Sequence, residues 1–160
     1  MAAEKFTTKF QAALADAQSS ALGRDHQFIE PVHLMLALLD QQGGSVRPLL
    51  DKSGTNVNVL RTKLGQALDR RPSVEGAPGE VHVGNDLVRL LNVTDKLAQQ
   101  RGDQYISSEL FVLAAFDDKG AVRDALKEAH ATKAAVEKAI EEISGGEAVN
   151  EANAEGARGA

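Results

Sequence analysis

The hydrophobic positions of this chain follow a pattern that occurs twice. The stretches FIEPVHLMLALL (residues 28–39) and YISSELFVLAAF (residues 105–116) both begin with an aromatic residue and isoleucine. Each then passes through a short polar step and becomes almost continuously apolar. At an offset of 77 residues, Ile29 matches Ile106, and further apolar matches continue on both sides. A self-match of this length indicates a tandem duplication.

Each copy predicts four helices. In the first and fourth helix of each copy, apolar residues recur at helical spacing. In the first copy, Pro31 suits the first turn of the second helix. The third helix of each copy is short. In the first copy we expect helices over residues 4–22, from 30 to about 39, over 45–52, and from 55 or 56 to about 68. In the second copy we expect a first helix over 87–101 and a second that begins at 107 or 108. A short third helix should end at about 129, and the fourth should begin at 132.

These patterns predict an all-α fold in which eight helices form two tandem, pseudo-symmetric four-helix repeats. Repeat one covers about 4–69 and repeat two about 85–144, so that residues 1–144 make one domain. The linker, residues 70–84, contains two prolines and three glycines and is predicted to be a loop. Residues 145–160 contain one large apolar residue and no periodicity, which predicts a flexible tether.

Composition narrows the class of protein. Hydrophobic residues make up 42% but aromatic residues only 4%, so the core must be built from small aliphatic side chains, which favours closely packed helices. The net charge of −5 argues against a general nucleic-acid binder. No apolar run approaches the length of a bilayer span, and the N-terminus is charged where a signal peptide would be apolar. We expect a soluble, cytoplasmic protein with no membrane partner.

No pattern in the sequence predicts an active site. The chain has no cysteine, and its four histidines lack the spacing of a metal site. Ser107-Ser108-Glu109 has no G-x-S-x-G surroundings, and helix capping explains it better. The phosphate loop G-x-x-x-x-G-K-[ST] does not occur. We therefore expect no catalytic residue, no metal and no cofactor in this chain, which is not predicted to be an enzyme.

A binding surface is better motivated, and it lies in the second repeat. On the fifth helix, Val93 lies at the margin of the inward face and Leu97 nearer to it, so either could remain open to solvent. With Leu110 at the start of the sixth helix, they are candidates for a partly open apolar groove. The candidate binding residues are Thr7 at the border of the groove, Asp103 and Glu109 as polar anchors at its rim, and Val93, Leu97 and Leu110.

A purely structural interpretation of the same residues stays open. The three apolar residues could belong to the core. Glu109 could be a carboxylate in the first turn of a helix, where it interacts with the helix dipole. Asp103 could hold the turn that follows Gly102.

The stretches KFQAALADAQSSALGRDHQFIEPVHLMLALL, LLDKSG and DKLAQQRGDQYISSELFVLAAF strongly resemble the amino-terminal domains of the ClpB disaggregases, which belong to the Clp family of hexameric ATPases. The resemblance covers roughly residues 5–145. It implies an α-helical substrate-recognition module without the motor. In that family, residues matching Thr7, Asp103 and Glu109 are associated with substrate binding beside a hydrophobic groove. A larger aliphatic residue is expected at position 93 in close relatives.

The resemblance implies that the partners are unfolded or aggregated polypeptides, bound for delivery to an ATP-driven, hexameric threading motor. The alternative is an adaptor-docking domain that binds one folded partner. ATP, magnesium, a homohexamer and a DnaK-type co-chaperone belong to the full-length family, and the isolated chain is expected to be a monomer.

Binding should be weak. A groove that buries about 400–500 Å² of apolar surface gains roughly 10–12 kcal/mol. Association and the ordering of an unfolded segment cost about 4–15 kcal/mol. The difference corresponds to micromolar-to-millimolar affinity. Carboxylates at the rim would favour apolar segments flanked by lysine or arginine.

Overall fold

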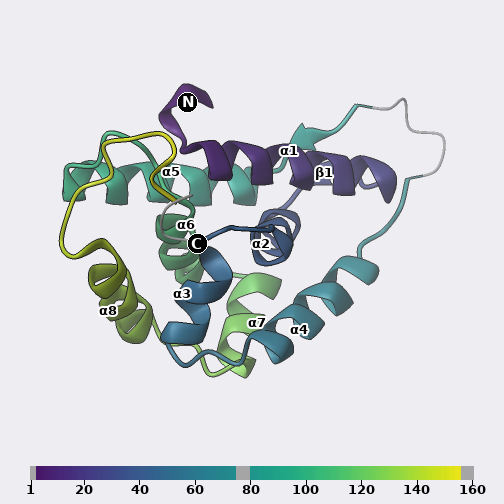
Figure 1. Cartoon of the computed structure of the whole chain (residues 1–160). Helices are drawn as coiled ribbons and strands as arrows, with labels where there is room; N and C mark the ends of the chain where they lie inside the picture. Colours follow the sequence, from purple (N-terminus) through teal and green to yellow (C-terminus); the bar gives the residue numbers. More distant parts are fainter. Residues whose placement is uncertain (1–2, 75–79, 156–160) are drawn as a thin grey trace.

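A computed structural model describes residues 3–74 and 80–155. Within these residues the fold is all-α, as predicted, and two short 3-10 turns, η1 and η2, accompany the α-helices (Figure 1). The elements are η1 (Ala3–Lys5), α1 (Thr8–Gly23), β1 (Phe28–Ile29), α2 (Pro31–Asp40), α3 (Val46–Lys52), α4 (Val57–Asp69), β2 (His82–Val83), α5 (Asn85–Arg101), α6 (Ser108–Ala114), η2 (Ala115–Asp117), α7 (Ala121–Glu128) and α8 (Lys133–Ser144).

The first helix begins later than the sequence pattern predicted. It starts at Thr8 and not at residue 4, because Thr7 is its N-cap and accepts a hydrogen bond from the backbone N–H of Phe10 on its hydroxyl oxygen. A capping threonine has extended backbone and ends the helical stretch in the N-terminal direction. Thr7 therefore has a structural role that the sequence analysis did not assign to it.

Two main-chain pairings between the repeats were not predicted. Strand β1 pairs in parallel with β2, with Ile29 opposite Val83. A second parallel bridge joins Phe6 to Ile106. At the offset of 77, Phe6 is equivalent to Val83 and Ile29 to Ile106, so the second pairing repeats the first with the roles of the two copies exchanged.

Hydrogen bonds beside these pairings follow the same symmetry. The N–H of Thr7 donates to the carbonyl of Ile106 at 3.0 Å, and the N–H of Gly84 donates to the carbonyl of Ile29 at 2.9 Å. Since Thr7 is equivalent to Gly84, each copy attaches the entry to its first helix to the other copy. The two repeats are thus joined by their backbones as well as by their side chains.

One hydrophobic core runs through both repeats. Helices α2 and α6 lie inside it, α4 packs against α7, and α3 packs against α8 (Figure 1). Phe10 of α1 is fully buried and contacts two other rings, Phe6 at 4.8 Å and Phe111 of α6 at 6.0 Å between ring centroids. Phe10 therefore connects the first helix of repeat one to the buried helix of repeat two.

The prediction of a flexible tether from residue 145 is wrong for part of that segment. Val149 and Glu155 are buried, and the chain between them is hydrogen-bonded to the rest of the domain. Residues 156–160, the remainder of the predicted tether, lie outside the described residues.

Two histidines that are seven residues apart in sequence form a buried pair. Nδ1 of His33 accepts the backbone N–H of Glu30 at 2.8 Å, so the proton of the neutral ring is on Nε2. That nitrogen lies 2.8 Å from Nδ1 of His26. Burial, followed by the neighbouring His26 and Arg71, lowers the pKa of His33 to about 4. Burial also lowers the pKa of His26.

This pair predicts a loss of stability in mild acid. The unfolded chain takes up a proton at His33 near pH 6.5, whereas the folded chain takes it up only near pH 4. Stability from this site is therefore complete above pH 6.5 and falls as the pH drops toward 4, by about 2–3 kcal/mol. Replacement of His33 by leucine, the residue that repeat two has at the equivalent position, should flatten the pH dependence of urea unfolding between pH 4 and 6.5. H82L, which removes an exposed histidine, is the control and should keep the pH dependence of the parent. If the unfolding free energy of H33L still changed with pH as it does in the parent, His33 would not be the source of the acid sensitivity.

The core predicts a large difference between two phenylalanines. Phe10→Ala removes a fully buried ring that touches both repeats, and we expect it to lower the free energy of unfolding by about 3–5 kcal/mol. Phe28 is 44% exposed, and Phe28→Ala should cost less than about 1 kcal/mol. Urea unfolding followed by circular dichroism measures both values, and similar losses in the two variants would contradict the packing described here.

Candidate functional site

The structure separates the six predicted site residues into two groups. Val93 and Leu97 lie together on the surface of α5. The other four, which are Thr7, Asp103, Glu109 and Leu110, have buried side chains near the starts of α1 and α6.

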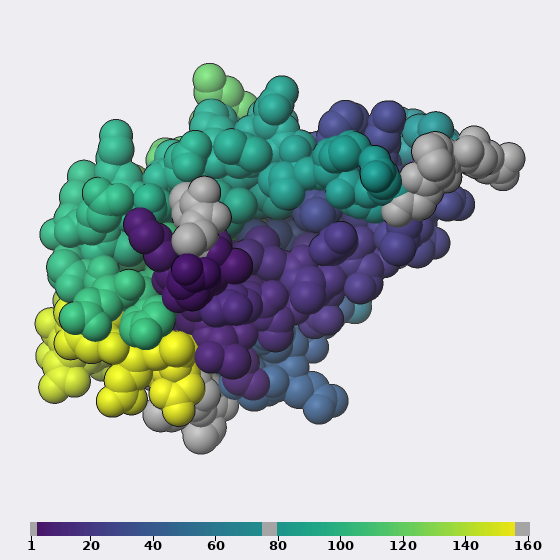
Figure 2. Space-filling view, turned by 90° about the horizontal axis from the view of Figure 1, so that it is seen from above, coloured from purple at the N-terminus to yellow at the C-terminus, as the bar shows by residue number. Residues whose placement is uncertain are grey.

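Val93 and Leu97 line a shallow hollow of about 430 Å³ on α5. Val88, which is 43% exposed and was not predicted, lines it as well. The other lining residues are Asn85, Arg89, Asn92, Lys96 and Gln100. A partly apolar hollow therefore lies on α5, and its charged lining residues are both cations. We call it the α5 groove. Figure 2 shows α5, in teal and green, and α1, in purple, on one face of the molecule.

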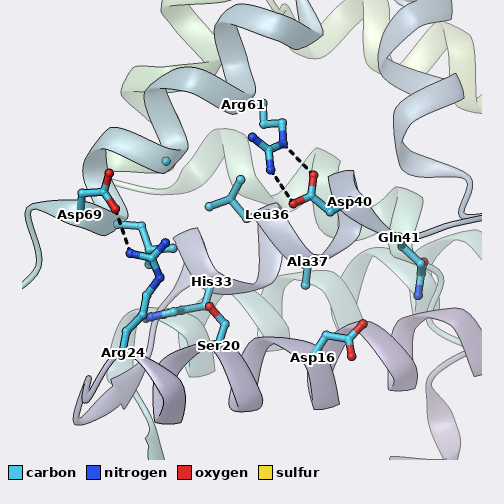
Figure 3. A pocket seen from close by; sticks show the side chains of 12 residues that line it. Asp16, Ser20, Arg24, His33, Leu36, Ala37, Asp40, Gln41, Arg61 and Asp69 are labelled. Atoms are coloured by element: carbon cyan, nitrogen blue, oxygen red, sulfur yellow. Dashed lines mark hydrogen bonds and ion pairs between the residues drawn. The ribbon is translucent and has the colours of Figure 1, made fainter.

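The equivalent face of repeat one is polar. Val93 and Leu97 match Asp16 and Ser20 of α1 at the offset of 77. These two residues line a hollow of about 470 Å³ between α1, α2 and α4 (Figure 3). Two ion pairs lie along this hollow, Arg24 with Asp69 at 2.8 Å and Arg61 with Asp40 at 2.8 Å. At these two matched positions repeat one is polar and repeat two is apolar.

Thr7 and Asp103 contact a segment of the chain itself. Residues 149–155, which we call the C-terminal strap, lie beside the start of α1, and Figure 2 shows the strap in yellow against the purple N-terminal part. The N–H of Val149 donates to Oδ1 of Asp103 at 2.9 Å. The carbonyl of Val149 accepts the N–H groups of Gln104 and Tyr105 at 2.8 and 3.2 Å. Farther along, the carbonyl of Ala152 accepts the N–H of Thr8 at 2.8 Å.

The strap ends in a buried carboxylate. The hydroxyl of Thr7 donates to Oε2 of Glu155 at 2.7 Å, the hydroxyl of Ser108 donates to the same oxygen at 3.1 Å, and the N–H of Ser108 donates to Oε1. Burial raises the pKa of Glu155, and the nearby carboxylate of Glu109 raises it further, while the three hydrogen bonds lower it. The site is therefore a small carboxylate-binding pocket made by Thr7 and Ser108.

Two of the predicted groove and rim residues are placed incorrectly by the sequence analysis. Leu110 is 1% exposed and belongs to the core, because every side chain of α6 is buried and the helix has no open face. Glu109 is also 1% exposed and lies in the first turn of α6. The side chain of Asp103 is 2% exposed and lies 3.8 Å from Nε of Arg101. The lining of the α5 groove includes neither carboxylate.

Ser108 is the functional candidate that the sequence analysis missed. It was rejected as a nucleophile and interpreted as a helix cap, yet it supplies two of the three side-chain hydrogen bonds to Glu155. The repeat alignment contains a signal for it, because Ser108 matches Pro31, which has no N–H to donate.

The described parts of the chain contain no group of three or more histidine, cysteine, aspartate or glutamate side chains that could hold a metal ion. Among the helices of residues 3–74 and 80–155, none is long and apolar enough to cross a membrane.

Comparison with known proteins agrees with this architecture. The family model of the Clp repeat N-terminal domain matches residues 5–153. The chain is similar to chaperone protein ClpB of Vibrio cholerae, with 55% identity over 155 residues, which are 97% of this chain and 18% of the relative. It thus spans less than a fifth of the length of the curated relatives it matches.

Two solved structures have the same fold. The N-terminal domain of Hsp104 from Candida albicans has a TM-score of 0.84 at 20% identity, covering 94% of this chain and 99% of that one. A ClpV N-domain in complex with a VipB peptide has a TM-score of 0.71 at 22% identity, covering 96% of this chain and 91% of that one. With its two interlocked four-helix repeats and its family match over residues 5–153, this chain belongs to the Clp repeat N-terminal domain family, with ClpB chaperones among its relatives.

Proposed function

We propose that this domain recognises exposed apolar segments of unfolded or aggregated polypeptides and holds them weakly for an ATP-driven, hexameric threading motor in a longer protein. In this proposal the domain itself performs no chemical step and binds no cofactor. ATP, magnesium, assembly into a homohexamer and cooperation with a DnaK-type co-chaperone belong to other parts of that protein, which acts in the cytoplasm.

The observation that carries this proposal is the difference between the two repeats. The shared fold requires largely apolar inward faces, and those of α1 and α5 are apolar except at Thr94, whose hydroxyl donates to the carbonyl of Leu90. On the outward side, repeat one has Asp16 and Ser20, whereas repeat two has Val93 and Leu97. Apolar surface that the fold does not bury is a mark of an interaction site. The α5 groove is therefore where we place the polypeptide.

The charges around the α5 groove change the expected preference. From the sequence we expected carboxylates at the rim and a preference for apolar segments flanked by lysine or arginine. The groove instead has Arg89 and Lys96 in its lining, and the carboxylates of Asp103 and Glu109 are buried elsewhere. We therefore expect apolar segments flanked by aspartate or glutamate to bind better than segments flanked by lysine or arginine.

The shape of the α5 groove fits weak binding. It is shallow and lies on one helix, so it covers only a short stretch of an extended chain. The apolar area that such a contact buries is offset in large part by the cost of ordering the partner. Several domains arranged around one assembly would raise the effective concentration and compensate for weak single contacts.

A second candidate function is adaptor docking, in which the domain binds one folded partner protein. The observation in its favour is that a ClpV N-domain, which has this fold, was solved in complex with a peptide of one particular protein, VipB. An adaptor-docking domain would capture a single protein from solution tightly and would bind an unfolded model protein poorly.

If the α5 groove binds the polypeptide, replacing a groove residue of repeat two by its polar counterpart from repeat one should weaken that binding. Leu97→Ser places the residue of the equivalent α1 position in the groove, and it should weaken binding of reduced, carboxymethylated α-lactalbumin, a permanently unfolded probe, by about 5–20-fold. Ser20→Ala at the equivalent position of α1 is the control and should leave the affinity unchanged. Fluorescence anisotropy measures both.

A backbone NMR titration with the same probe separates the possibilities. Shifts centred on residues 88–100 support the α5 groove. Shifts centred on residues 11–24 of α1, or equal affinity of the parent and Leu97→Ser, would show that the polypeptide binds elsewhere. Tight capture of one folded protein without binding to the unfolded probe would favour the adaptor alternative.

A further inference from the structure

We propose that the C-terminal strap is an internal ligand that closes a second peptide-binding site on this domain, and that a polypeptide must displace the strap to use this site. The site is formed by the backbone N–H groups of Thr8, Gln104 and Tyr105, the carboxylate of Asp103, and the Thr7–Ser108 pocket. Its ligand class is a segment in which an aliphatic residue is followed six positions later by a carboxylate, with a turn between them such as the one at residues 151–153 of the strap. The proposal rests on the proposed function only in taking the competing ligand to be a polypeptide.

The strap contacts the domain as a bound peptide would. Its backbone supplies one donor at Val149 and two acceptor carbonyls, at Val149 and Ala152. Any chain that adopts the turned conformation of the strap presents these main-chain groups, so they select a conformation and not a sequence. Selectivity comes from the buried side chain of Val149 and from the carboxylate of Glu155.

Comparison of the repeats shows that this carboxylate position is a regular feature of the fold. In repeat one, the Glu30 carboxylate lies so close over Gly84 that a side chain at position 84 would collide with it. Gly84 is the equivalent of Thr7, against which the carboxylate of Glu155 lies. Each half therefore has a carboxylate at the same place, where the two repeats meet.

The source of the carboxylate differs between the halves. In repeat one it belongs to the N-cap residue Glu30, which forms a reciprocal capping box with His33, and Pro31 leaves no N–H to satisfy. In repeat two the N-cap residue Ser107 makes no capping hydrogen bond through its side chain, and Ser108 has an N–H to donate. Repeat one closes this position from within, whereas repeat two takes a carboxylate from another segment, and in this structure the strap supplies it.

The contact is suited to exchange. Glu155 is held by three hydrogen bonds, but burial and the nearby Glu109 oppose its charged form. The exposed residues of the strap, among them Asn150 and Glu151, add little buried surface. A segment with two buried anchors can leave without unfolding the domain, and a partner with the same two anchors can replace it.

The test uses the full chain with a matched pair of variants. Glu155→Ala removes the buried anchor, and Glu151→Ala removes the same charge from an exposed position of the strap. Amide hydrogen exchange is followed by NMR at the N–H groups that face the strap, which are those of Thr8, Gln104, Tyr105 and Ser108. We expect faster exchange at these groups in Glu155→Ala and the parent rate in Glu151→Ala.

Two probes then measure access to the site by fluorescence anisotropy. The first is a labelled peptide with the sequence of residues 147–155, EAVNEANAE, acetylated and amidated at its ends. The second is reduced, carboxymethylated α-lactalbumin. If the strap covers the site in most molecules, its release should raise the apparent affinity for both probes by about 5–10-fold in Glu155→Ala and leave it unchanged in Glu151→Ala.

Unchanged exchange in Glu155→Ala would overturn the proposal, because Glu155 would then not hold the strap. Faster exchange with unchanged affinity for the strap peptide would also overturn it, because the uncovered surface would not be a binding site. A gain for the strap peptide with no binding of α-lactalbumin by any variant would support the internal ligand and count against the proposed function. The two proposals can therefore fail separately.

Discussion

The exchange of short parallel pairings between the repeats is the constraint on which the rest of the structure depends. Phe6 pairs with Ile106, and Val83 pairs with Ile29, so the residues just before α1 and α5 are each held against the residues that precede the buried helix of the other copy. These pairings bring Thr7 to the start of α6. The Thr7–Ser108 pocket could not form within one repeat, since its two sides come from different copies.

The duplication preserves what the core requires and diverges where it does not. Most residues that face the common core are apolar in both copies, because an unpaired polar group there would lose its hydrogen bonds to water. The buried His33, which matches Leu110, is an exception whose ring is hydrogen-bonded. Positions 16 and 93 are half-buried or exposed, so aspartate and valine both satisfy the fold, and a binding role can select between them. At positions 31 and 108 both residues satisfy the start of a helix, but only serine retains an N–H that can bind a ligand.

The sequence predicts the helices of this fold well, because each of the longer ones has a regular apolar face and an identifiable start or stop, such as Pro31 or Gly102. It does not predict strands of two residues, which are too short to show an alternating pattern. Val93 and Leu97 line the α5 groove because they lie at the edge of the inward face of α5, and their role in substrate binding stays a prediction. The burial of Leu110 and Glu109 was not predicted, because α6 is buried on every side and its helical phase therefore gives no information about exposure.

The strap was missed for a different reason. Its attachment depends on backbone groups, which every residue carries, and on one glutamate in a segment whose composition is typical of linkers. The α5 groove and the strap site bind through different groups. The groove offers apolar side chains and cations, whereas the strap site offers main-chain hydrogen bonds and a pocket that binds a carboxylate. Gln100, which lines the groove, is only three residues from Asp103, which holds the strap. An extended chain that reached from one to the other would combine two weak contacts, and the strength of the combination would depend on how often the strap is absent.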